Sequence, residues 1–85
     1  MTPIHELLNR IRWDKDYGDA VFVIGYYDHI EDRIITVPLK ELTFDKEDHF
    51  DFGLKDDEGE WQSIPLHRIR RVFRNGELVW ERRVE

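Results

Sequence analysis

Hydrophobic positions at the start of the chain recur with the period of a helix. Thr2-Pro3 predicts where this helix begins, with the Thr2 hydroxyl as N-cap and the proline in the first helical position. The helix is expected to end near Trp13-Asp14, and a loop is expected over residues 16–19. One apolar stripe is predicted along it: Ile4, Leu7, Leu8 and Ile11.

Two strands are predicted next. Residues 20–27 are rich in β-branched and aromatic side chains, and a polar turn over residues 28–32 separates them from a second strand over residues 33–39. Pro38 cannot donate to a hydrogen-bond ladder, so we expect it at a strand end or on a sheet edge. The first strand is predicted to bury one face: Phe22, Ile24 and Tyr26.

The middle of the chain is acidic and carries spaced aromatic residues. Alternation predicts a short strand over residues 49–54, a turn over residues 56–59 and a strand over residues 61–64 that pairs back through that turn. The expected apolar anchors of this region are Phe44, Phe50, Phe52 and Leu54.

The last third of the chain predicts a hairpin. A bend over residues 66–68 follows Pro65, and Asn75-Gly76 then joins strands over residues 69–74 and 77–82. Asn-Gly between two such runs is the strongest short hairpin signal, because both residues accept the positive φ of a type I′ turn.

A helix over residues 66–74 is the competing interpretation, because the hydrophobic positions there also fit helical spacing. With the hairpin preferred, the elements predict a single α+β domain over residues 1–85. The connections are too short for the crossovers that parallel strands need. We therefore expect one N-terminal helix packed on a curved or barrel-like, mostly antiparallel sheet of five to six strands.

Composition narrows the function classes. Eighty-five residues allow one modest core, and eleven aromatic residues argue against disorder. The longest apolar run, Ala20–Ile24, is far too short to span a bilayer. The absence of cysteine excludes a disulfide framework, and the four histidines lack metal-ligand spacing. We expect a cytoplasmic protein with no cofactor, no metal and no membrane partner.

Charge is unevenly distributed along the chain, whose net charge is −6. Nine acidic residues lie between residues 41 and 60, whereas six arginines lie between residues 67 and 83. One interpretation is a basic face for an anionic ligand, and the other is that the two blocks pair with each other. A pI near 5.1 predicts poor non-specific duplex binding. A smaller basic group comprises Arg10, Arg12 and Lys15.

Two stretches carry a more specific signal. Residues 7–14 read Leu-Leu-Asn-Arg-Ile-Arg-Trp-Asp and residues 64–69 read Ile-Pro-Leu-His-Arg-Ile, with Ile-Gly-Tyr-Tyr-Asp at 24–28 between them. In this order they resemble the RNA cyclic group end recognition domain family. The resemblance covers essentially the whole chain, and the stretch at 64–69 is its most specific part. It departs from the family at His29, where arginine is usual.

The resemblance implies a non-catalytic RNA-binding module. Such a module would capture a processed, single-stranded RNA end that carries a 2′,3′-cyclic phosphate and deliver it to an RNA-processing or RNA-repair enzyme. Eight residues are the candidate RNA- and phosphate-binding positions: Asn9, Arg12, Trp13, Tyr26, Asp28, His67, Arg68 and Arg70.

The side-chain chemistry agrees with that implication. Arg68 offers a planar fork of donors for a phosphate, and His67 donates to a phosphate oxygen or exchanges a proton near neutral pH. Asn9 suits a base edge or a ribose hydroxyl. An unpaired base would stack on one of three aromatic rings: those of Trp13, Tyr26 and Tyr27.

Each candidate also has a structural interpretation. Trp13 would close the apolar stripe of the helix, and Tyr26 would be half-buried in the sheet. His67 would lock the bend by donating to a backbone carbonyl, Asn9 would cap or tie the helix, and Arg68 would form an ion pair with Asp28 or Asp14. Trp61 and Trp80 are expected in the core or on a hairpin.

Two other functions remain open from the sequence. One is a small RNA-end phosphodiesterase in which His67 works with His5 or His29 as acid and base. The other is a protein-interaction domain whose basic C-terminal hairpin docks an acidic partner.

Overall fold

Two N-terminal helices precede six strands in the computed structural model, which describes residues 2–44 and 50–82. This arrangement confirms the predicted α+β class. In chain order the elements are α1 (Ile4–Trp13), α2 (Lys15–Gly18), β1 (Phe22–Asp28), β2 (Arg33–Pro38), the 3-10 turn η1 (Leu39–Glu41), β3 (Asp51–Lys55), β4 (Trp61–Pro65), the 3-10 turn η2 (Leu66–Arg68), β5 (Ile69–Arg74) and β6 (Glu77–Glu81).

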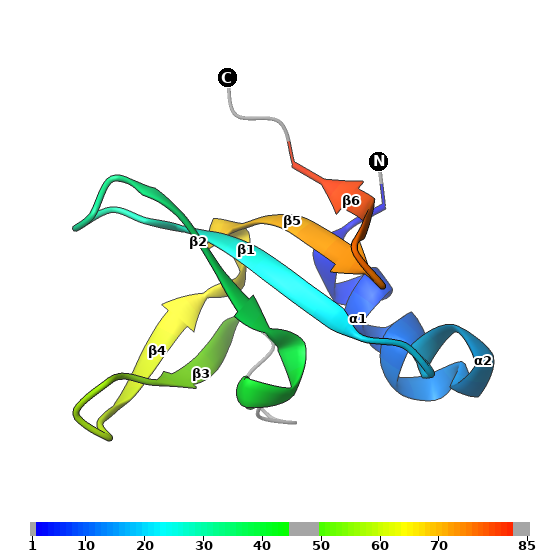
Figure 1. The fold of residues 1–85 in the computed structure, drawn as a ribbon, viewed down its shortest axis with the longest axis horizontal. Helices are drawn as coiled ribbons and strands as arrows, with labels where there is room; N and C mark the ends of the chain where they lie inside the picture. Colours follow the sequence, from blue (N-terminus) through cyan, green and yellow to red (C-terminus); the bar gives the residue numbers. More distant parts are fainter. Residues whose placement is uncertain (1, 45–49, 83–85) are drawn as a thin grey trace.

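The strands form two antiparallel sheets. Four strands are ordered β2-β1-β5-β6, and β3 pairs with β4 in a separate hairpin that projects to the lower left of Figure 1. The barrel-like sheet that the sequence suggested is wrong, because the described strands do not close. Instead of pairing with β2, the β3–β4 hairpin is tied to the preceding chain by two backbone hydrogen bonds between Gly53 and Thr43.

One core nevertheless joins both sheets and α1, which lies behind β1 and β5 in Figure 1. Phe52 of β3 is 1% exposed and packs edge-on against Tyr26 of β1, with ring centroids 5.9 Å apart. The ring centroid of Phe44 lies 6.3 Å from that of Phe52. The largest fully buried side chains are Phe52, Ile24, Ile69 and Val72.

The start of α1 differs from the prediction. Pro3, not Thr2, is the N-cap residue, because the Pro3 carbonyl accepts from the backbone N–H groups of Glu6 and Leu7. The Thr2 carbonyl instead accepts a hydrogen bond of 2.6 Å from Trp80 Nε1. That bond fixes the N-terminal end of α1 to β6.

The loop expected over residues 16–19 is also wrong, since Lys15–Gly18 forms the short helix α2. Its N-cap is Asp14, whose carboxylate accepts from the backbone N–H groups of Asp16 and Tyr17. This capping supplies partners for two of the donors that a helix start leaves unsatisfied.

The C-terminal hairpin is confirmed, and the competing helix over residues 66–74 does not form. Asn75 and Gly76 have φ of 50° and 83°, as a type I′ turn requires. The pairing of β1 with β5 has a bulge between Gly25 and Tyr26. Gly25 pairs with Arg71 and Tyr26 pairs with Ile69, so Arg70 has no partner residue on β1. Each of the other predicted strands lies within two residues of its predicted bounds.

One expected core anchor is misplaced. Phe50 is 80% exposed because β3 begins only at Asp51, so Phe50 does not share the inward face of Phe52. Residue 49, where this strand was predicted to start, lies outside the described part. No described helix has the length and apolar character needed to cross a membrane.

Candidate functional site

The 3-10 turn η2 separates two groups of polar side chains. Pro65 ends β4, and the turn is held by a bond of 2.7 Å from the Leu66 N–H to the Phe50 carbonyl. The neighbours His67 and Arg68 then diverge: His67 lines a pocket, while Arg68 reaches the β1–β2 turn. The predicted pair is therefore split between two places.

The pocket is an open hollow of about 570 Å³ between the first turn of α1, the start of β3, η2 and the end of β6. Its apolar wall includes the buried residues Ile4 and Leu66, and its polar groups are two imidazoles, one guanidinium and one carboxylate. The lining residues are Ile4, His5, Phe50, Asp51, Pro65, Leu66, His67 and Arg82.

Arg82 is held in position by the fold. Its Nη1 donates to the His67 carbonyl at 3.2 Å, and its guanidinium lies 5.5 Å from the Trp80 ring centroid. Its Nε is buried and has no hydrogen-bond partner among the described residues. The guanidinium therefore forms part of the pocket wall with donor capacity that no described carboxylate uses.

The two imidazoles in the pocket are exposed. Within residues 2–44 and 50–82, neither the His5 nor the His67 side chain makes a recorded hydrogen bond. The η2 turn is held without the His67 ring, so the idea that this ring locks the bend is not needed. Imidazole N–H groups and a guanidinium together suit an anion of phosphate size. Asp51 adds an acceptor, which suits a ribose or base donor.

Arg68 belongs to a second group, the Arg68 cluster, made of Asp28, His29 and Arg68. The Arg68 Nη1 donates to His29 Nδ1 at 2.6 Å, so the His29 ring accepts in its neutral form. The Asp28 carboxylate accepts from the backbone N–H groups of Glu31 and Ile30, which is the main reason that its pKa is lowered. The positive charge of Arg68 lowers that pKa further.

No ion pair joins Arg68 to Asp28 or Asp14 in the described part of the chain, where the guanidinium instead contacts His29. His29 thus takes up part of the donor capacity of Arg68. Arg68 and Arg82 each use one Nη1 donor on a partner within the protein.

Arg70 lies beside the Arg68 cluster. Its guanidinium is 5.5 Å from the Tyr27 ring centroid, and its Nε is buried with no described partner. The Tyr27 hydroxyl donates to Asp32, and this bond is the main reason that the pKa of Tyr27 is raised. Tyr26, by contrast, is 7% exposed within the core, so its ring is not available for stacking on a base.

Asn9, Arg12 and Trp13 lie along α1, outside both groups. Trp13 is 75% exposed, and the guanidinium of Arg12 lies 5.5 Å from its ring centroid. The expectation that Trp13 closes the apolar stripe is wrong, because nine residues place it half a turn from the buried Ile4. Asn9 makes no recorded side-chain hydrogen bond in the described part, so it neither caps nor ties the helix.

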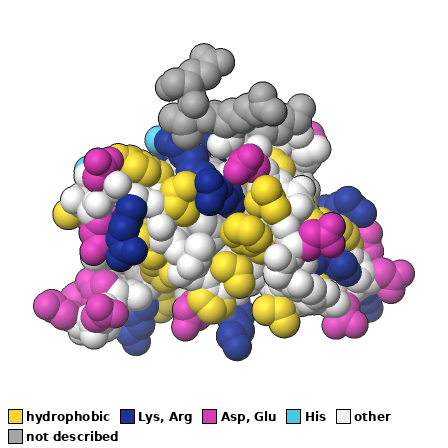
Figure 2. All heavy atoms as spheres, turned by 45° about the horizontal axis from the view of Figure 1, so that its top comes forward, with side chains coloured by type: hydrophobic (Ala, Val, Ile, Leu, Met, Phe, Trp, Pro, Cys, Tyr) yellow, Lys and Arg dark blue, Asp and Glu magenta, His cyan; other side chains and the backbone are white. Residues whose placement is uncertain are grey.

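The acidic and basic blocks do not pair with each other in the described residues. Figure 2 shows both signs of charge around a central group of hydrophobic side chains on one face. The arginines around η2 thus keep their charge unpaired there. The recorded ion pairs are Arg10–Asp14 at 4.0 Å, Arg33–Glu31 at 3.2 Å and Arg71–Glu81 at 3.1 Å.

Sequence reasoning missed three of the four polar members of the pocket: His5, Asp51 and Arg82. His5 was considered only as a catalytic partner of His67, and Arg82 was one of many arginines near the C-terminus. The spacing of His5 on the polar face of α1 was a usable signal, whereas nothing local marked Arg82. Within the described residues no group of three metal-ligating side chains occurs.

The sequence has recognisable relatives among known proteins. The family model described as "MJ1316 RNA cyclic group end recognition domain" matches residues 1–82. A UPF0248 protein of Methanococcus maripaludis strain C5 is 34% identical over 83 residues, which cover 94% of this chain and 99% of that protein. A UPF0248 protein of strain S2 is 32% identical with the same coverage. No solved structure matches the chain.

Proposed function

The chain belongs to the MJ1316 RNA cyclic group end recognition domain family, and from that premise we propose that its pocket binds RNA 3′ ends carrying a 2′,3′-cyclic phosphate. The observation that carries the proposal is that His5, His67 and Arg82 line one pocket and form no described ion pair. The two histidines and the arginine would donate to the oxygens of the phosphate.

The apolar wall of the pocket supports a terminal nucleoside rather than a free phosphate ion. Ile4 and Leu66 offer a surface for the ribose or the base, and Asp51 would accept from an amino group of the base. A cyclic phosphate carries one negative charge and lacks the terminal 2′- and 3′-hydroxyls. Because this end carries a single charge, placing it beside an apolar wall costs less desolvation than placing a doubly charged linear phosphate there. The pocket should therefore favour the cyclic end.

Arg68 and Arg70 are assigned a different role. They lie on the other side of η2 and would attract the RNA backbone electrostatically without reading its end. Delivery of the bound end to an RNA-processing or RNA-repair enzyme is part of the same proposal. A module that binds the end without changing it leaves the chemical step to such an enzyme.

The adjacent residues His67 and Arg68 supply the test and its matched control. We expect His67→Ala to weaken binding of a cyclic-ended oligonucleotide about tenfold or more, the worth of one hydrogen bond to a charged group. Arg68→Ala should weaken all ends equally and reduce the salt dependence of binding. The measurement is fluorescence anisotropy with RNAs that end in hydroxyl, linear phosphate or cyclic phosphate.

The opposite pattern would overturn the assignment of the pocket. If Arg68→Ala removed the preference for the cyclic end and His67→Ala did not, the Arg68 cluster would hold the end. If neither the wild type nor any variant distinguished the three ends, recognition of the cyclic group would be rejected for this chain.

Hydrolysis of the cyclic phosphate is a second candidate, favoured by the presence of both His5 and His67 in one pocket. Water would attack phosphorus and break one P–O bond to the ribose, one imidazole taking the proton of water and the other protonating the departing oxygen. Among the described residues neither ring makes a hydrogen bond that would orient it for acid–base work, so we favour binding without turnover. Release of a monoester that His5→Ala and His67→Ala both abolish would reverse this preference.

Docking of an acidic partner on the basic hairpin has less support. Arg71 already pairs with Glu81, and Arg74 donates to the backbone carbonyls of Tyr17 and Asp16. These intramolecular partners use the donors that a docked carboxylate would need.

A further inference from the structure

The polar face of α1 continues from the pocket. His5 lines the pocket, and Asn9 and Arg12 follow it at intervals of four and three residues on the same side of the helix. At a rise of about 1.5 Å per residue, Asn9 lies about 6 Å and Arg12 about 10 Å beyond His5 along the axis. This span is comparable with the length of two nucleotides of an extended strand.

Trp13 lies at the far end of this face, one turn beyond Asn9. Its ring is 75% exposed, and its recorded partner in the described part of the chain is the Arg12 guanidinium. An exposed tryptophan beside an arginine is the combination on which proteins stack unpaired bases, and stacking tolerates any base.

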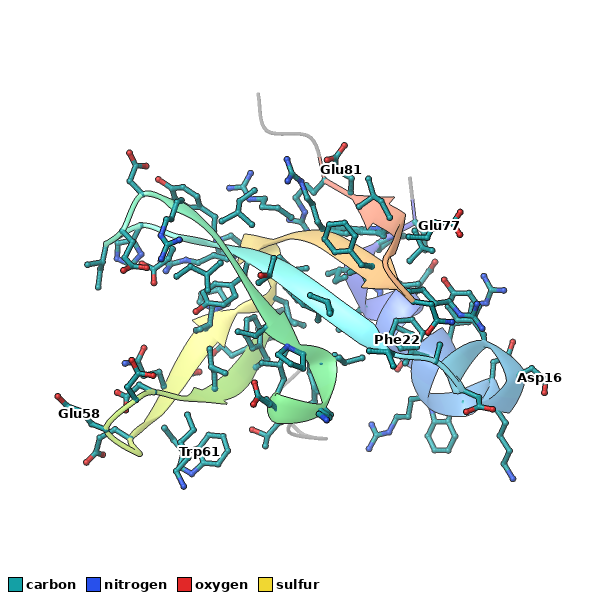
Figure 3. The ribbon with its side chains drawn as sticks, in the orientation of Figure 1. Asp16, Phe22, Glu58, Trp61, Glu77 and Glu81 are labelled. Carbon is teal, nitrogen blue, oxygen red and sulfur yellow. The ribbon has the colours of Figure 1, made fainter. Side chains whose placement is uncertain are left out.

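The charges near Trp13 suit RNA. The carboxylate of Asp14 is occupied by the N–H groups at the start of α2 and lies 4.0 Å from Arg10, which leaves Arg12 free to meet a backbone phosphate. Trp61 is the contrasting case. It is 58% exposed and has Lys55 beside its ring, but it projects from the β3–β4 hairpin, whose turn is acidic, at the opposite end of Figure 3 from Asp16 of α2.

We propose that α1 forms a second subsite, which holds the unpaired nucleotides that precede the bound RNA end. One base stacks on Trp13, a backbone phosphate meets Arg12, and Asn9 contacts a base edge or a 2′-hydroxyl between them. This inference rests on the proposed function, since the pocket sets where the strand begins. It makes the preferred ligand a single-stranded 3′ tail of about three nucleotides, because a base held in a duplex cannot unstack onto Trp13 at the same cost.

A length series tests the subsite. For cyclic-ended RNAs of one to four nucleotides, wild-type affinity is expected to rise roughly fivefold to 150-fold by the third nucleotide, the range that stacking provides, and then to level off. Trp13→Ala should remove most of this rise while binding of the cyclic mononucleotide stays unchanged. Trp61→Ala, the matched exposed tryptophan, should keep the whole rise.

Equal affinity for the one- and four-nucleotide ligands in the wild type, or equal effects of Trp13→Ala and Trp61→Ala, would overturn the subsite. The fate of the proposed function is read separately, from the comparison of cyclic and linear ends at each length. If the end chemistry made no difference while a Trp13-dependent rise remained, end recognition would fail and α1 would stand as an RNA-binding surface.

Discussion

Phe52 offers the sharpest test of how the site is built, because it holds the β3–β4 hairpin to the rest of the core. The ring is 1% exposed and contacts Tyr26 and Phe44. Truncation of a buried phenylalanine to alanine costs about 3–5 kcal/mol, from lost transfer free energy and the cavity left behind. An 85-residue domain is stable by roughly 4–13 kcal/mol in total, so Phe52→Ala should remove a large part of its stability.

Urea unfolding followed by tryptophan fluorescence measures this loss. With a slope of about 1–3 kcal/mol per molar urea, the midpoint should fall by about 1 M or more. Phe52→Leu keeps most of the apolar volume and should lose less than about 1.5 kcal/mol. Ile30→Ala, at an 84% exposed position, is the surface control and should change stability by less than about 0.5 kcal/mol.

A loss below about 1 kcal/mol for Phe52→Ala would refute the reasoning. The β3–β4 hairpin would then not share the core with the larger sheet. Since the start of β3 contributes Asp51 to the pocket, the pocket would lose one fixed wall. The Phe52→Leu variant, folded and with β3 docked, should retain its affinity for the cyclic RNA end.

Three further predictions follow from individual contacts. Asp56 accepts several hydrogen bonds, chiefly from backbone N–H groups, which lowers its pKa below the ordinary 3.8. The stabilisation of the folded state by the Asp56 carboxylate is therefore present at pH values above 3.8 and is lost as the pH falls through the lower pKa of the folded state. The urea midpoint of Asp56→Asn should for this reason fall less on acidification than that of the wild type. Trp80→Phe removes the bond to the Thr2 carbonyl and should cost about 0.5–1.5 kcal/mol of thermal stability. Gly18→Ala would drive a Cβ into the Ile11 carbonyl oxygen, well inside van der Waals contact, and should cost about 1–3 kcal/mol by the same urea assay.

The parts of the fold that depend on local signals were predictable. The Asn75-Gly76 turn and the alternation of residue types in β1 each depend on residues that are adjacent in the sequence. Both the turn and the strand formed where expected. The short helix α2 was not predicted because four residues are too few to show the helical spacing of hydrophobic positions. Its formation rests on one capping carboxylate, that of Asp14.

The pocket was only partly predictable because its members come from both ends of the chain. His67 was identified through its motif, but His5 and Arg82 reach it through the packing of α1 and β6, which the Trp80–Thr2 bond fixes. The separation of His67 from Arg68 depends on the geometry of a single 3-10 turn. No sequence pattern specifies to which side of such a turn each neighbour points.

The most direct test of the central claim is an NMR titration of the labelled protein with three short RNAs that differ only in a 3′ hydroxyl, linear phosphate or 2′,3′-cyclic phosphate. The account predicts that signals of His5, His67 and Arg82 shift with the cyclic end and far less with the others. Shifts confined to His29 and Arg68, equal shifts with all three ends, or no shifts at moderate salt would contradict it.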